Sequence, residues 1–161
     1  MFGVLFDLQQ RALVWPVRAH SNKLLGFTRR YLPGHQLRYE YPRGFTRPLF
    51  PCDKFRGSRA ILVEGPLDAM WLHQHGYYGA LATLGTSVTA KQLAWLRAHV
   101  AEVVLMFDND PAGKAVTQKL LPRLLEFRLW LAKLPDDVKD PQELSAEQLE
   151  KALAEIKPFG I

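Results

Sequence analysis

The chain has 161 residues, enough for one domain or slightly more, and its composition of 48% apolar and 23% charged residues excludes a disordered protein. The single cysteine, Cys52, excludes a disulfide framework and a cysteine-based zinc site. The sequence has no uncharged apolar stretch of about 18 residues, which excludes a membrane-spanning helix. The first residues, Met1–Gln10, do not have the pattern of a signal peptide, so we expect a cytoplasmic protein.

The net charge of +5 is unevenly distributed along the chain. Residues 1–60 contain 11 Lys and Arg against 3 Asp and Glu, whereas residues 61–161 contain 10 against 13. A basic part beside an acidic part indicates an anionic partner for the first and a different task for the second. Nucleic acid is the obvious polyanion, although a solvated arginine-rich surface would give the same counts.

Short strands are predicted in the first sixty residues, over 12–17, 23–29 and 36–41, where β-prone residues lie between turn residues. Residues 42–57 contain three prolines and two glycines, which predicts a loop or linker. We therefore expect a small, basic, β-rich N-terminal subdomain over residues 1–57 and a second domain over residues 58–161.

From residue 59 onward the pattern changes to alternating strands and helices. Strands are predicted over 60–63, 79–84, 102–107 and 127–133, and helices over 67–75, 90–99, 112–125 and 146–156. This alternation predicts an α/β domain with a central parallel sheet flanked by helices. In such sheets, ligands bind at the carboxyl ends of the strands.

Five acidic residues fall at that predicted edge of the sheet. They are Glu64 after the first strand, Asp68 in the next helical turn, Asp108 and Asp110 after the third strand, and Asp140 past the fourth. Oxygen ligands grouped in this way suit Mg²⁺. Taken singly, an aspartate here could be a helix cap, a partner of the helix dipole or a turn residue. A glutamate directly after a buried strand is costly to leave unpaired, and the set of five favours a metal site.

The segments that carry these acids resemble one family. Glu64-Gly65-Pro66-Leu67-Asp68, Leu84-Gly85-Thr86-Ser87 and Phe107-Asp108-Asn109-Asp110-Pro111-Ala112-Gly113 are similar to motifs of the Toprim domain. The second and third segments narrow the resemblance to DnaG-type primases of bacteria and phages. Val138-Lys139-Asp140-Pro141-Gln142-Glu143 resembles the third acidic motif of these enzymes. Glutamine at 142, where cellular primases often have a second acid, resembles the phage primase-helicase version with one aspartate.

The resemblance extends over residues 12–157. Val14–Arg18 and Leu25–Arg30 are similar to the strands that precede the Toprim core in primases. Arg38-Tyr39 and Phe45–Phe50 lie where that family places basic residues that face template and nucleotide. The resemblance thus implies a Toprim fold, a central parallel sheet flanked by helices and preceded by a small basic β-rich subdomain.

The activity implied by the resemblance is synthesis of short RNA primers from NTPs on a single-stranded DNA template. Two Mg²⁺ ions, or Mn²⁺ in their place, would be bound mainly by Asp108 and Asp110, with Glu64 sharing an ion. Asp68 and Asp140 would complete the second site or orient waters, and Glu64, Asp108 and Asp110 are the expected catalytic residues. The expected nucleotide or DNA contacts are Arg29, Arg30, Arg38, Arg43, Arg47 and Lys54.

Two other functions fit the same motifs. A Toprim nuclease would use the same metals to cleave a phosphodiester, and a non-catalytic module would only bind nucleic acid or a replication partner. The Leu84–Ser87 stretch and the basic N-terminal segment favour a primase, and the complete acidic set argues against a non-catalytic relic. One cysteine cannot build the zinc-binding, template-reading module of primases. A separate zinc-binding module or a replicative helicase is therefore an expected partner.

Overall fold

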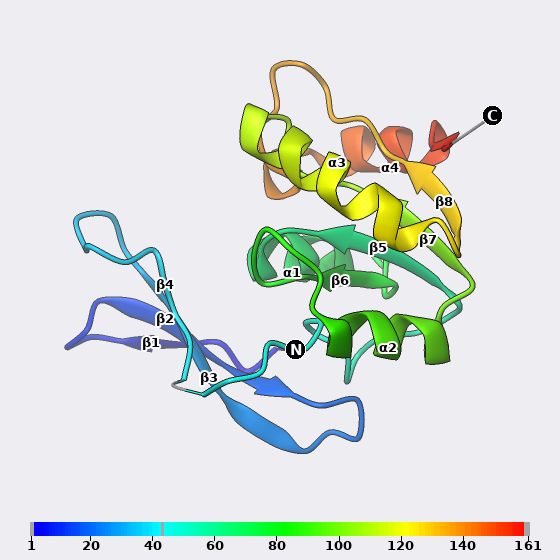
Figure 1. Ribbon diagram of the computed structural model, residues 1–161. Helices are drawn as coiled ribbons and strands as arrows, with labels where there is room; N and C mark the ends of the chain where they lie inside the picture. Colours follow the sequence, from blue (N-terminus) through cyan, green and yellow to red (C-terminus); the bar gives the residue numbers. More distant parts are fainter. Residues whose placement is uncertain (1, 43, 160–161) are drawn as a thin grey trace. The chain divides into compact units, whose positions relative to one another are not determined.

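The computed structural model describes residues 2–42 and 44–159 and consists of two compact units, residues 1–46 and 47–161 (Figure 1). Each unit has its own sheet. No helix in the described part of the chain has the length and apolarity needed to cross a membrane.

The first unit is a four-stranded antiparallel sheet in the order β1-β2-β3-β4. Its strands are β1 (Leu5–Asp7), β2 (Ala12–Arg18), β3 (Leu24–Tyr31) and β4 (Tyr39–Glu40). The predicted strands at 12–17 and 23–29 are confirmed, and the third is reduced to two residues. β1 was not predicted because three residues are too few to show a period of two.

The register of this sheet separates two faces. Trp15 pairs with Thr28, and both are fully buried on one face. Val14 pairs with Arg29, and Arg29 pairs with Glu40, on the opposite face. Apart from the buried Ala12, side chains of the second face are half-buried or exposed.

The second unit is a five-stranded sheet in the order β6-β5-β7-β8-β9, in which only the edge strand β9 is antiparallel. Its strands are β5 (Arg59–Val63), β6 (Ala80–Ala82), β7 (Glu102–Leu105), β8 (Arg128–Leu131) and β9 (Lys157–Pro158). Its helices are α1 (Pro66–Gln74), α2 (Ala90–His99), α3 (Pro111–Leu124), the 3₁₀ turn η1 (Pro141–Glu143) and α4 (Ala146–Ala154). The predicted fold class is confirmed, and the edge strand β9 is an addition too short to be predicted.

Local sequence explains where these elements begin. Pro66 occupies the first turn of α1, where a missing N–H costs nothing. α2 begins with a capping box of Thr89 and Gln92, and α4 with the equivalent pair Ser145 and Gln148. α2 and α3 bury apolar side chains against one face of the sheet, and α1 and α4 lie on the other face (Figure 1).

The segment 47–57 packs within the second unit, although the sequence grouped it with the first. Phe50 forms an antiparallel bridge with Ala82 at the β6 edge, with N–O distances of 3.0 and 2.6 Å. Leu49, Cys52 and Phe55 are buried in the core of the second unit. The prolines and glycines correctly predicted a loop, but these apolar side chains attach the loop to the second sheet.

Candidate metal and catalytic site

The acidic site lies at the carboxyl edge of the second sheet. The parallel register pairs Leu62 of β5 with Leu105 of β7, and Leu105 with Leu131 of β8. Glu64 and Asp108, which follow β5 and β7, therefore leave the sheet at the same edge. The chain after β8 also reaches this edge. There the carbonyl of Lys139 accepts a hydrogen bond from the backbone N–H of Asn109, which follows β7, at 2.8 Å.

Asp108 is the centre of the acidic cluster. Burial, followed by the negative charges of Asp140, Asp68 and Glu64 and a hydrogen bond with Asp140, raises the pKa of Asp108 from 3.8 to about 8. Its Oδ1 atom is buried and has no hydrogen-bond partner among the described residues. Three of the other four predicted acids thus act on the Asp108 carboxylate, which favours a proton or a cation.

Asp68 connects two loops of this edge. Its Oδ2 accepts a hydrogen bond from the N–H of Gly65 at 3.1 Å, and its Oδ1 accepts one from the N–H of Gln142 at 3.2 Å. The side chain is buried, with 5% exposure. The helix-start role considered from the sequence is present, and the second hydrogen bond also ties the β5–α1 turn to η1.

Gln142 orients Asp140 directly. Its Nε2 donates to Asp140 Oδ2 at 3.3 Å, while its backbone N–H binds Asp68. The glutamine that replaces the second acid of the third motif therefore supplies two donors to the carboxylate cluster. The sequence marked this position only as a departure from the cellular pattern.

Asp110 is held by the start of α3. Its Oδ1 accepts from the N–H of Gly113 at 2.8 Å, and its Oδ2 lies 3.8 Å from Lys139 Nζ. Asp110 is thus the N-cap that the sequence offered as an alternative to a metal ligand. Gly113 lies so close to the backbone of Asp108 that a Cβ there would overlap it, which fixes α3 against the acidic cluster.

The Leu84–Ser87 loop contacts the acidic edge at Glu64. The N–H of Leu84 donates to the carbonyl of Glu64 at 3.2 Å, and the hydroxyl of Thr83 donates to the carbonyl of Gly85 at 2.6 Å. Arg47 donates from Nη1 to the carbonyl of Leu84 at 2.9 Å. A Cβ at Gly85, where φ is +151°, would overlap the Arg47 guanidinium, so this loop needs glycine to hold the arginine.

The model of the Toprim-like family matches residues 61–145, which is more than half of the chain and includes all five acidic residues of this edge. The chain belongs to the Toprim-like family. The second unit, residues 47–161, is called the Toprim unit below.

Similar proteins narrow the family to primases of the DnaG type. The DNA primase of Deinococcus radiodurans is 33% identical over 156 residues, covering 88% of this chain and 27% of the relative. That of Clostridium acetobutylicum is 31% identical over 150 residues, covering 86% and 25%. The chain thus spans about a quarter of the length of these relatives. The predicted resemblance to DnaG-type primases is confirmed.

Solved structures agree on the fold. A DNA primase domain from Pseudomonas aeruginosa has a TM-score of 0.81 at 20% identity, covering 98% of this chain and 57% of that one. The Aquifex aeolicus primase, with zinc-binding and RNA polymerase domains, has a TM-score of 0.81 at 25% identity, covering 98% and 45%. A DnaG primase catalytic domain bound to ssDNA has a TM-score of 0.77 at 26% identity, covering 97% and 56%.

The predicted basic residues divide between the two units. Arg29 lies 3.7 Å from Glu40, Arg30 donates to the hydroxyl of Tyr39 at 3.3 Å, and the guanidinium of Arg38 lies over the Tyr39 ring. In the Toprim unit, Arg47 binds the Leu84–Ser87 loop, and Lys54 lies 3.5 Å from Asp53. Arg43 lies outside the described residues.

The amide side chains are the part of the Toprim site that sequence reasoning missed. Besides Gln142, Asn109 donates from Nδ2 to the carbonyl of Pro135 at 3.1 Å and so fastens the loop after β8. Its position between two aspartates was the available signal. Across the described residues, no three acidic, histidine or cysteine side chains are already spaced to ligate one ion together.

Proposed function

We propose that this chain is the Toprim part of a DNA primase and supports synthesis of short RNA primers from NTPs on single-stranded DNA. The observation that carries the proposal is the buried Asp108 carboxylate surrounded by Glu64, Asp68 and Asp140. The names of the relatives and of the ssDNA-bound structural neighbour support it. The matched quarter of the relatives includes this acidic edge.

The residues at this edge fit a divalent metal. All the donors are carboxylate oxygens, which Mg²⁺ and Mn²⁺ prefer, and Asp108 has a buried oxygen without a hydrogen-bond partner among the described residues. Burial and the neighbouring negative charges raise the pKa of Asp108, and a bound cation would relieve the repulsion between these charges. Glu64, Asp108 and Asp110 would hold two ions, with Asp68 and Asp140 beside them.

The chemistry that such bound ions supply is activation of an attacking 3′-hydroxyl and stabilisation of charge on the transferred phosphate. The chain's own residues fix the positions of the loops that carry the acidic side chains. Asp68 and Gln142 hold the two acidic loops together, and Gly113 holds the start of α3 against Asp108.

Basic residues would bind the phosphates of nucleotide and template. Arg47 is held beside the Glu64 end of β5 by the Leu84 carbonyl, which suits a contact with a nucleoside triphosphate. The remaining proposed phosphate contacts are Arg29, Arg30, Arg38, Arg43 and Lys54.

Removal of the Arg47 charge is expected to weaken binding of nucleoside triphosphates. Arg47→Met should reduce the affinity for ATP in the presence of Mg²⁺ about tenfold, because a charge-assisted hydrogen bond contributes about 1.5–3 kcal/mol. Isothermal calorimetry with the full chain, with Mg²⁺ and with EDTA, measures the effect.

Arg128→Met is the matched control for this measurement. Arg128 begins β8 at the opposite edge of the sheet, where its side chain is 80% exposed and pairs with Glu102. Its removal should leave ATP binding unchanged. An equal loss of ATP affinity in the two variants, or an ATP affinity that does not depend on Mg²⁺, would contradict the proposed role of Arg47.

A further inference from the structure

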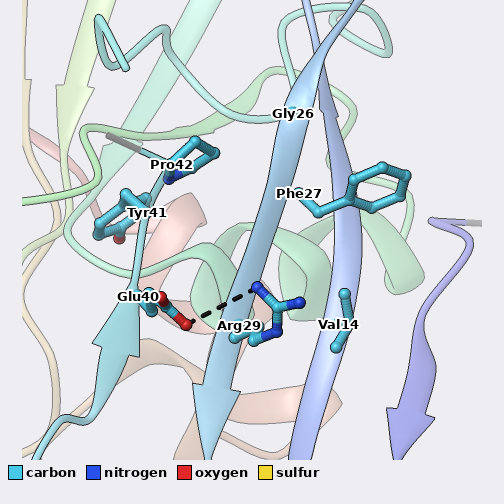
Figure 2. A pocket seen from close by; sticks show the side chains of 7 residues that line it. All are labelled: Val14, Gly26, Phe27, Arg29, Glu40, Tyr41 and Pro42. Atoms are coloured by element: carbon cyan, nitrogen blue, oxygen red, sulfur yellow. Dashed lines mark ion pairs between the residues drawn. The ribbon is translucent and has the colours of Figure 1, made fainter. Parts of the chain in front are cut away.

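The first unit contains an open cavity of about 360 Å³ on one face of its sheet (Figure 2). Tyr41 and Pro42, just after β4, line one side, and Phe27 of β3 lines the other. Arg29 reaches across to Glu40 between them. The register explains this grouping, because Val14, Arg29 and Glu40 are successive partners across β2, β3 and β4.

Two of the residues that line this cavity, Tyr41 and Phe27, carry aromatic rings. The ring of Tyr41 lies near-parallel to those of Tyr39 and Phe45, with centroid separations of 6.4 and 6.2 Å and interplanar angles of 20° and 7°. Phe27 is 48% exposed, so an apolar surface remains in contact with water. A flat apolar ligand would cover that surface.

The polar groups of the cavity are a fixed acceptor and a donor. Glu40 Oε2 accepts a hydrogen bond from the hydroxyl of Tyr31 at 2.6 Å and lies 3.7 Å from Arg29 Nη1. Arg29 Nε is buried and has no hydrogen-bond partner within the described part of the chain. The carboxylate disfavours a phosphate group here, because two negative charges would approach each other.

We propose that this cavity binds one unpaired base of a single-stranded nucleic acid and that Glu40 reads the base edge. The inference rests on the proposed function, since primer synthesis requires an unpaired template strand. Single-stranded nucleic acids are bound by stacking of bases on aromatic rings and by hydrogen bonds to their edges. A volume of this size admits one base with its sugar and excludes a duplex.

The chemistry of Glu40 predicts which base is preferred. A carboxylate accepts a hydrogen bond from the N4 amino group of cytosine, whereas thymine presents a carbonyl oxygen at the equivalent position. The cavity should therefore favour cytosine over thymine.

Fluorescence anisotropy with the full chain and labelled oligo(dC) and oligo(dT) of equal length tests the inference at pH 8. We expect oligo(dC) to bind about tenfold more tightly, as one specific base contact is worth about 1–3 kcal/mol. Glu40→Gln should abolish this preference while keeping an acceptor for Tyr31. Tyr41→Leu should weaken binding of both oligomers, and Tyr41→Phe, which keeps the ring, should not.

Salt dependence separates base binding from phosphate binding. Glu40→Gln and Tyr41→Leu should leave the slope of log affinity against log salt unchanged, because neither removes a phosphate contact. Parallel titrations with oligo(rC) compare the affinity for RNA with that for DNA, which distinguishes binding of a primer base from binding of a template base. Unchanged preference in Glu40→Gln, with DNA binding retained, would overturn this inference alone. Binding of none of the oligomers would overturn the proposed template binding as well.

Discussion

Replacing Asp108 by asparagine is expected to stabilise the metal-free protein at pH 8 and to abolish its stabilisation by Mg²⁺ or Mn²⁺. Burial and the charges of Asp140, Asp68 and Glu64 raise the pKa of Asp108 to about 8 in the folded chain, against 3.8 for the ordinary group. The folded state therefore binds a proton that the unfolded state releases above about pH 4. The contribution of Asp108 to the free energy of unfolding is therefore greatest at low pH and decreases as the pH rises toward 8.

The neutral amide of asparagine does not titrate, so the variant does not lose this stability as the pH rises. Asp108→Asn should raise the melting temperature by about 5 °C at pH 8 and much less at pH 5, because the native proton is retained at pH 5. In the wild-type protein, a saturating divalent metal should raise the melting temperature at pH 8 by a similar amount, since a ligand at a hundred times its Kd contributes about 2.7 kcal/mol. Differential scanning fluorimetry at both pH values, with metal and with EDTA, measures all of these shifts.

Asp136→Asn is the control for the Asp108 substitution. Asp136 is 88% exposed and pairs only loosely with Lys133 at 3.2 Å, in the same β8–η1 connection as Asp140. It should change neither the melting temperature nor the response to metal. An Asp108→Asn protein that is less stable at pH 8, or that keeps the full metal response, would contradict the proposed metal site.

Replacing Gln92 by alanine is expected to cost about 3 kcal/mol in the free energy of unfolding. The Gln92 side chain is 1% exposed and makes three hydrogen bonds. Its Nε2 donates to the carbonyls of Pro48 and Thr83, at 3.0 and 2.8 Å, and its Oε1 accepts from the N–H of Thr89 at 2.8 Å. Alanine leaves these backbone groups without a partner, at about 1–3 kcal/mol for each buried group.

Gln148 provides a matched comparison because it occupies the same capping-box position at the start of α4. Its Oε1 accepts from the N–H of Ser145 at 2.9 Å in an exposed setting. Gln148→Ala should cost about 0.5–1 kcal/mol, since water replaces the lost hydrogen bond. Urea unfolding of both variants measures the difference. Equal losses would show that Gln92 acts only as a helix cap and does not fasten the segment at Pro48 to the strand before the Leu84–Ser87 loop.

Much of the Toprim unit could be predicted because its signals are local. The continuous apolar run at residues 60–63 predicted β5, and the helices predicted over 67–75 and 90–99 correspond to α1 and α2, the second at its observed bounds. The acidic cluster followed from one rule, that parallel strands end at a common edge. Three of the other four acids, Asp140, Asp68 and Glu64, do interact electrostatically with Asp108.

The remaining features depend on contacts between distant residues. Gln92 binds Pro48, which lies 44 residues earlier, and Gln142 binds Asp68, 74 residues earlier. No short-range pattern marks such partners. The cavity of the first unit was missed for the same reason, because it depends on strand register, and β4 is only two residues long.

Primer synthesis by the purified chain tests the account most directly. The protein would be incubated with single-stranded DNA, radiolabelled NTPs and Mg²⁺ or Mn²⁺, beside the Glu64→Gln and Asp136→Asn variants. We predict short RNA products that require the metal, are lost in Glu64→Gln and persist in Asp136→Asn. Metal-dependent degradation of the DNA without RNA products, or RNA products that persist in Glu64→Gln, would contradict the proposed function.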